Sequence, residues 1–93
     1  MSNNPIRIFL VDDSPYFLDV AREFLQYQNA LTVVGVASDA EAAVTQALAL
    51  APDVILLDLN LERSSGLRLI PVFKAQLPTA KVIILTIMEE SGY

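Results

Sequence analysis

Acidic and hydroxyl side chains stand where three apolar runs of this sequence stop. Asp12 and Asp13 follow the first run, Asp58 ends the third, and Thr86 ends the fourth. Short runs of aliphatic and β-branched residues without alternation are typical of strands buried on both faces of a parallel sheet. In open α/β sheets, ligands and chemistry collect at the carboxyl ends of such strands. If these strands are neighbours, we expect three carboxylates and a hydroxyl to meet in one cleft.

Three carboxylates in one cleft require a counter-cation, because like charges repel and burial disfavours the charged form. The sequence contains no cysteine and no histidine, so the cation must be a hard one that binds oxygen. Mg²⁺ fits best, because it uses one or two protein carboxylates, keeps waters and bridges to phosphate oxygens. Asp58 is then a candidate nucleophile, since carboxylates attack phosphoryl donors and a metal neutralises the transferring oxygens.

Each of these residues also has a purely structural interpretation. Asp58 could cap the following loop, and Asp13 could stabilise the N-terminus of the next helix. Thr86 is a β-forming residue at a strand end, and Asn60 could favour a turn. Asp53 begins its strand at the opposite end of the sheet, so we expect it to be structural.

Composition narrows the class of protein. The chain has 93 residues, of which 54% are hydrophobic and 18% charged, which indicates one small folded domain rather than disorder. The formal net charge of −5 argues against a nucleic-acid surface within these residues. No run is long enough to span a bilayer, and the N-terminus lacks the features of a signal peptide. We therefore expect a cytoplasmic location without membrane contact.

Strands and helices alternate along the chain. Hydrophobic patterns and turn signals predict strands at residues 6–11, 31–37, 53–60 and 81–86, and helices at 15–28, 40–50 and about 67–77. The order β-α-β-α-β-α-β with short links predicts an α/β fold, a parallel sheet covered by helices on both faces.

Local signals mark where the first two helices begin. Ser14 before Pro15 predicts one N-cap, and Ser38 with Glu41 three residues later has capping-box spacing. In the first helix, we expect the aromatic residues Tyr16 and Phe24 to pack rather than bind ligands.

The third helix is harder to delimit. We expect it to bury Leu67, Ile70, Phe73 and Leu77. Pro71 is tolerable only in the first turn of a helix, so it leaves the start uncertain by a few residues.

Motifs at residues 10–14, 52–59, 66–67 and 82–86 together resemble the receiver domain of two-component response regulators along the whole chain. The amino-acid sequence around the third strand and at residues 86–90 is most similar to that of the subfamily with a helix-turn-helix output domain. That subfamily regulates transcription. The resemblance implies one receiver domain over residues 1–93. It also implies a flavodoxin-like sheet of order 2-1-3-4, in which the family's fifth strand and last helix would be absent.

At matching positions the resemblance implies a phosphorelay site. Asp58 corresponds to the phospho-acceptor, and Asp12 and Asp13 to the acidic pair that binds Mg²⁺. The backbone carbonyl of Asn60 would join the metal, and Thr86 would be the switch hydroxyl that binds the new phosphoryl group. The donor would be a sensor histidine kinase. Self-catalysed transfer and hydrolysis would be the only enzymatic activity.

Departures from the family pattern leave other functions open. Glu62 stands where the family often has a proline, and the family's fifth-strand lysine has no counterpart. Lys81 lies at the wrong end of the sheet to replace it. We therefore expect impaired phosphotransfer and a bare fourth-strand edge through which the chain forms homo-oligomers. A non-phosphorylated interaction or dimerisation module is the alternative. A haloacid-dehalogenase-like phosphatase fits less well, because that enzyme class has a second acid two residues after its nucleophile, and here that position is Asn60.

Overall fold

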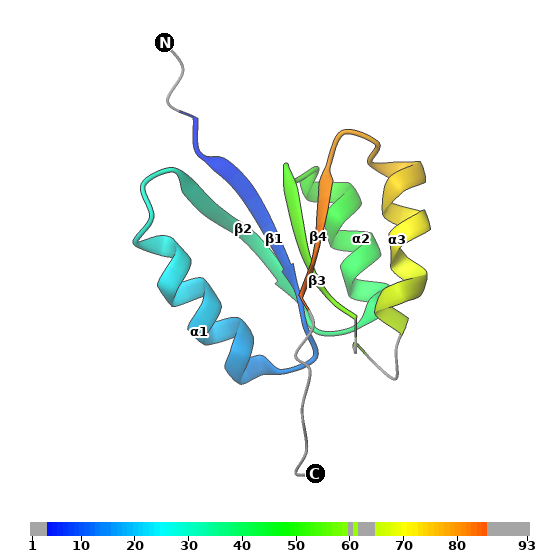
Figure 1. Ribbon diagram of the computed structural model, residues 1–93, viewed down its shortest axis with the longest axis horizontal. Coiled ribbons are helices and arrows are strands. Elements are labelled where there is room, and N and C mark those ends of the chain that lie inside the picture. Colours follow the sequence, from blue (N-terminus) through cyan, green and yellow to red (C-terminus); the bar gives the residue numbers. More distant parts are fainter. Residues whose placement is uncertain (1–3, 60, 62–64, 86–93) are drawn as a thin grey trace, which may run out of the picture.

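The computed structural model describes residues 4–59, 61 and 65–85, which form one α/β sandwich (Figure 1). The elements are β1 (Ile6–Val11), α1 (Pro15–Gln26), β2 (Leu31–Ala37), α2 (Ala40–Leu50), β3 (Val54–Asp58), α3 (Ser65–Gln76) and β4 (Lys81–Leu85). The four strands pair in parallel in the order β2-β1-β3-β4. This confirms the predicted α/β class and the flavodoxin-like strand order.

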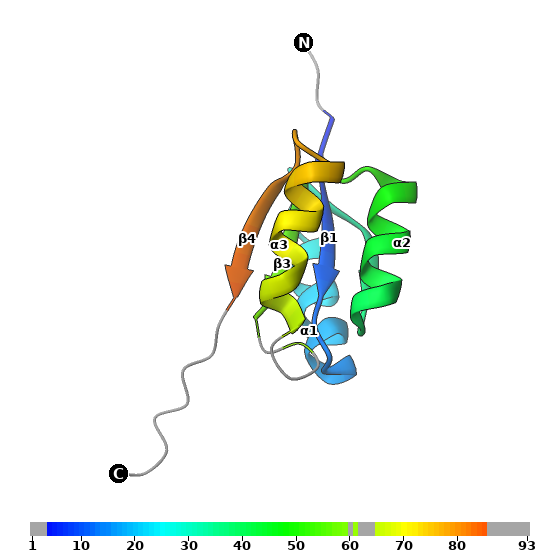
Figure 2. The same ribbon diagram turned by 90° about the vertical axis from the view of Figure 1, so that its right-hand side faces the viewer.

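Alternate residues of the sheet pack into two separate hydrophobic cores. Phe9 and Val11 point toward α2 and α3, whereas Ile8 and Leu10 point toward α1. This is the two-residue period of a strand, expressed on both faces because helices cover both. Figure 2 shows α2 and α3 side by side on one face of the sheet.

Strand β4 is much less buried than β1 or β3. Ile55 and Leu57 of β3 are fully buried, but Ile83 and Ile84 of β4 remain 48% and 43% exposed. In the part of the chain that the structure describes, β4 pairs only with β3 and lies at the sheet edge. The expected exposure of the fourth-strand edge is therefore observed.

The amino end of the sheet is held by Asp53, as expected for a structural acid. Its Oδ2 accepts a hydrogen bond from the Arg7 backbone N–H at 2.9 Å, and the Arg7 side chain donates to the Ala51 carbonyl at 2.7 Å. Ala51 itself has a left-handed φ of 48°, which ends α2 just before Pro52. Asp53 thus ties β1 to the start of β3, away from the proposed chemistry.

The two predicted N-caps have different outcomes. Ser14 caps α1 as expected, and its hydroxyl accepts from the Phe17 N–H at 3.2 Å. For α2, the prediction that Ser38 is the N-cap was wrong. Asp39 directly precedes the helix, and its side chain accepts from the Ala42 N–H at 2.8 Å. Asp is as good an N-cap as Ser, and position decides between them.

Helix α3 begins at Ser65, earlier than expected. Ile70 and Leu77 pack partly buried against the core as expected. Leu69 and Phe73 are buried, whereas Leu67, predicted to be buried, is 59% exposed. Pro71 lies in the second turn rather than the first. Pro71 has no backbone N–H, so the Leu67 carbonyl lacks the helical hydrogen bond that residue 71 would otherwise donate. Both residues are exposed, and water can hydrogen-bond to this carbonyl instead.

Candidate metal centre

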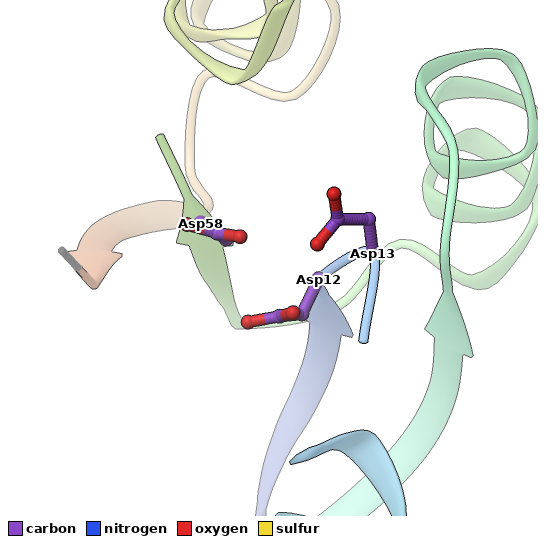
Figure 3. A group of neighbouring side chains, drawn as sticks. All are labelled: Asp12, Asp13 and Asp58. Carbon is purple, nitrogen blue, oxygen red and sulfur yellow. The ribbon is translucent and has the colours of Figure 1, made fainter. Parts of the chain in front are cut away.

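Three carboxylates meet at the carboxyl ends of the two central strands (Figure 3). Asp12 and Asp13 directly follow β1, and Asp58 is the last residue of β3. The parallel register pairs Val11 with Leu57, which sets Asp12 beside Asp58. Each side chain offers one oxygen to a group in which all three oxygens lie within 4.8 Å of one another. The sequence prediction that these three side chains converge is confirmed.

The Asp12 side chain is fixed by hydrogen bonds around the β1–α1 turn. Its Oδ1 accepts from the Ser14 backbone N–H at 2.9 Å, and its own N–H donates to the Ala37 carbonyl at 3.1 Å. Because Ser14 also caps α1, one short turn places the carboxylate and begins the helix. The site is therefore built partly by the folding of β1 and α1.

Electrostatics in this group favour a cation. Burial raises the pKa of the Asp12 carboxyl, and the Ser14 N–H lowers it by a smaller amount. The neighbouring carboxylates of Asp58 and Asp13 raise the Asp12 pKa further. Burial and two neighbouring carboxylates thus both disfavour the charged form of Asp12. A bound cation would favour that charged form.

The donor set fits Mg²⁺ in its chemistry. All three ligand atoms are carboxylate oxygens, and Asp13 is exposed, so a hard ion could keep part of its water shell. Asn60 and Thr86, the other two predicted site residues, lie outside the described residues, as does Glu62. The structure thus brings together three of the five.

Two contacts that the sequence analysis did not single out hold the chain just after Asp58. The Leu61 N–H donates to the Asp58 carbonyl at 3.3 Å, and the Leu61 side chain is fully buried. The Leu59 N–H donates to the Leu85 carbonyl at 3.4 Å. A single leucine within a polar loop was the available signal that this loop is anchored.

Helix α1 presents an exposed apolar stripe next to the site. Tyr16 and Phe24, expected to pack inside, are 78% and 64% exposed, and Val20 and Tyr27 also face outward. These residues recur at spacings of three and four, so they share one helix face. The stripe begins two residues after Ser14. The expectation that Tyr16 and Phe24 pack was wrong. Leu18, Ala21 and Leu25 take the face of α1 toward the sheet.

Comparison with known proteins agrees with this geometry. Residues 8–93 match the family model of the response regulator receiver domain. The chain belongs to that family. The resemblance drawn from the sequence motifs is therefore confirmed. None of the helices in the described residues is long and apolar enough to cross a membrane.

Relatives carry this receiver domain in proteins of different kinds. The chain is 33% identical over its full length to an uncharacterized transcriptional regulatory protein, YxjL, of Bacillus subtilis, and covers 43% of that protein. It is 31% identical over 99% of its length to a protein-glutamate methylesterase/protein-glutamine glutaminase of Thermotoga maritima, and covers 27% of it. The crystal structure of the response regulator domain of Thermotoga maritima CheB superposes with a TM-score of 0.84 at 31% identity, covering 96% of this chain and 66% of that one. The chain spans less than half the length of these two curated relatives.

Proposed function

We propose that this receiver domain accepts a phosphoryl group onto Asp58 from a sensor histidine kinase in a Mg²⁺-dependent reaction. The observation that carries the proposal is the group of Asp12, Asp13 and Asp58 oxygens within 4.8 Å at the carboxyl ends of β1 and β3. Carboxylates so close together repel one another, and a bound cation would offset that repulsion. A metal-assisted phosphoryl transfer gives each of them a role.

The reaction follows from the position of Asp58. One of its carboxylate oxygens attacks the phosphorus of the donor, the bond from phosphorus to the donor's imidazole nitrogen breaks, and the electron pair stays on that nitrogen. Bound Mg²⁺ would neutralise charge on the phosphoryl oxygens. Asp12 is held ready for the ion by the Ser14 N–H, and Asp13 approaches it from the solvent side. The Asn60 carbonyl and the Thr86 hydroxyl complete the proposed site as metal ligand and switch.

A protein donor would meet the apolar stripe of α1. Tyr16, Val20, Phe24 and Tyr27 are exposed along this helix, whose first turn adjoins Asp13. Exposed apolar patches of this kind mark protein interaction sites. We propose that the kinase contacts this stripe in the cytoplasm. DNA would be contacted only by an output domain of a longer protein, as expected for regulators of transcription.

The test is phosphorylation by a small donor, which needs no cognate kinase. Incubation with acetyl phosphate and Mg²⁺ should add one phosphoryl group to a fraction of the chains, in keeping with the impaired transfer expected from the sequence, and intact mass measures that fraction. A chelator should prevent the addition, because the metal offsets the charge of the three carboxylates. If no adduct forms at saturating donor and Mg²⁺, the proposal fails and the non-phosphorylated interaction module takes its place.

Strand β4 supports a second proposal, self-association of this 93-residue chain. Ile83 and Ile84 leave an apolar strand exposed at the edge of the described sheet, and such edges pair with other chains. We expect light scattering over a dilution series to show an average mass that rises with concentration. A monodisperse monomer at the highest concentration would contradict the proposed pairing.

A further inference from the structure

Gly66 lies directly against the backbone of the proposed phospho-acceptor. It is a buried residue in the first turn of α3. A Cβ built on Gly66 would collide with the Asp58 carbonyl oxygen, and would lie 3.0 Å from the Leu59 Cα and 3.1 Å from the Asp58 carbonyl carbon. Its backbone is helical, so lack of space rather than φ excludes any larger residue here. The start of α3 and the end of β3 thus meet with no side chain between them.

Helix α3 has little freedom to retreat from such a collision. Leu69 and Phe73, three and seven residues further on, are buried in the core shared with α2. Moving the helix outward would open a cavity around both side chains, which is strongly unfavourable in a close-packed core. The less constrained partner is the chain after Asp58.

The Asp58 carbonyl is also the acceptor of the turn that follows it. The Leu61 N–H donates to this oxygen, and the buried Leu61 side chain anchors the turn in the same core. The Leu59 N–H reaches the Leu85 carbonyl only at 3.4 Å, a long bond that resists displacement weakly. A push on the Asp58 carbonyl would therefore strain the Leu61 bond and turn the Asp58 peptide.

We propose that Gly66 is a positioning residue for Asp58. By letting α3 pack directly on the acceptor backbone, it holds the Asp58 carboxylate at its separation from Asp12 and Asp13. This inference deepens the proposed function and rests on it where metal binding is concerned. Substituting residues that orient metal ligands without touching the metal typically lowers the affinity for the metal by about 10-fold to 100-fold.

Gly66→Ala tests the inference, with Gly35→Ala as the matched control. A Cβ at Gly35 in β2 would lie 2.7 Å from the Leu50 Cδ1 and 3.2 Å from the Phe9 ring, a crowded position on another strand. Both variants should lose stability. Only Gly66→Ala should bind Mg²⁺ about tenfold more weakly in a calorimetric titration. Only Gly66→Ala should speed amide hydrogen exchange at Leu61 beyond the change at Leu10 of β1, which reports global unfolding.

The exchange measurement separates this inference from the proposed function. If the wild-type chain binds no Mg²⁺, the proposed function fails, while Leu61 exchange still decides whether Gly66 positions the acceptor turn. Equal Leu61 exchange and equal Mg²⁺ affinity in folded Gly66→Ala would overturn the inference. An osmolyte that strengthens burial is added if this variant unfolds. Failure to fold even then would assign Gly66 to the fold alone and also overturn it.

Discussion

The Asp58→Asn variant should take up no phosphoryl group from acetyl phosphate and Mg²⁺, whereas a measurable fraction of the wild-type chains should take up one. The amide that replaces the carboxylate has no anionic oxygen to attack phosphorus, and it removes one of the three metal ligands. The change preserves size and shape at the end of β3, so the sheet pairing of Asp58 with Leu85 should persist. Intact-mass measurement gives the result directly, and circular dichroism confirms that the variant is folded.

Asp39→Asn is the matched control for this loss. Asp39 follows the carboxyl end of β2, on the same side of the sheet as the carboxyl ends of β1 and β3. It lies outside the group of three acids. Asn caps a helix as well as Asp does, so the side-chain oxygen at position 39 should still accept from the Ala42 N–H of α2. This variant has the same change in net charge and should be phosphorylated like wild type. Adduct formation in Asp58→Asn, on Asp13 or elsewhere, would show that Asp58 is not the acceptor.

The sequence was most informative about the strands and their ends. Apolar runs with short links predicted β1 and β2 at the bounds that the structure shows, and the carboxyl end of β3 within two residues. Asp12, Asp13 and Asp58 follow from that prediction, because parallel neighbours place their last residues together. The chemistry of the strand ends made Asp58 a candidate nucleophile, and the family resemblance then assigned it the role of phospho-acceptor.

Details that depend on tertiary contacts could not be predicted in this way. Leu67 is exposed because Leu69, Ile70 and Phe73 take the face of α3 toward the core, and the sequence also supplies apolar residues outside that face. Phe24 became exposed because the sheet accepts only one side of α1, and the sequence supplies apolar residues on two sides. Gly66 was recognisable as a motif residue. Its proximity to the Asp58 carbonyl depends on how α3 crosses β3, which no local pattern encodes.

The charge on Asp12 has opposite effects on cation binding and on the stability of the fold. Its pKa is raised, chiefly by burial and then by the neighbouring acids, so the folded protein holds the Asp12 proton more tightly than the unfolded chain does. The stabilisation due to protonated Asp12 is complete below the ordinary carboxyl pKa and is lost as the pH rises through the raised value. At neutral pH without metal, charged Asp12 therefore destabilises the fold.

The Asp12→Asn variant should consequently be more stable than wild type in chelator at neutral pH, by about 0.5 kcal/mol, the usual size for a partly exposed charge. The amide oxygen can still accept from the Ser14 N–H, so the β1–α1 turn is kept. The advantage should shrink on acidification, since wild-type Asp12 then becomes neutral as well. Urea unfolding followed by circular dichroism, repeated at several pH values, measures the difference.

Mg²⁺ should reverse the order of the two proteins. At a concentration one hundred times its dissociation constant, a ligand that binds only the folded state adds about 2.7 kcal/mol of stability. Wild type should gain this and Asp12→Asn almost none, because one of its three anionic ligands is gone. Asp39→Asn, which alters an acid outside the group, should respond to Mg²⁺ as wild type does. If Asp12→Asn is the less stable protein in chelator, or gains as much from Mg²⁺ as wild type, then the group of three acids is not a cation site.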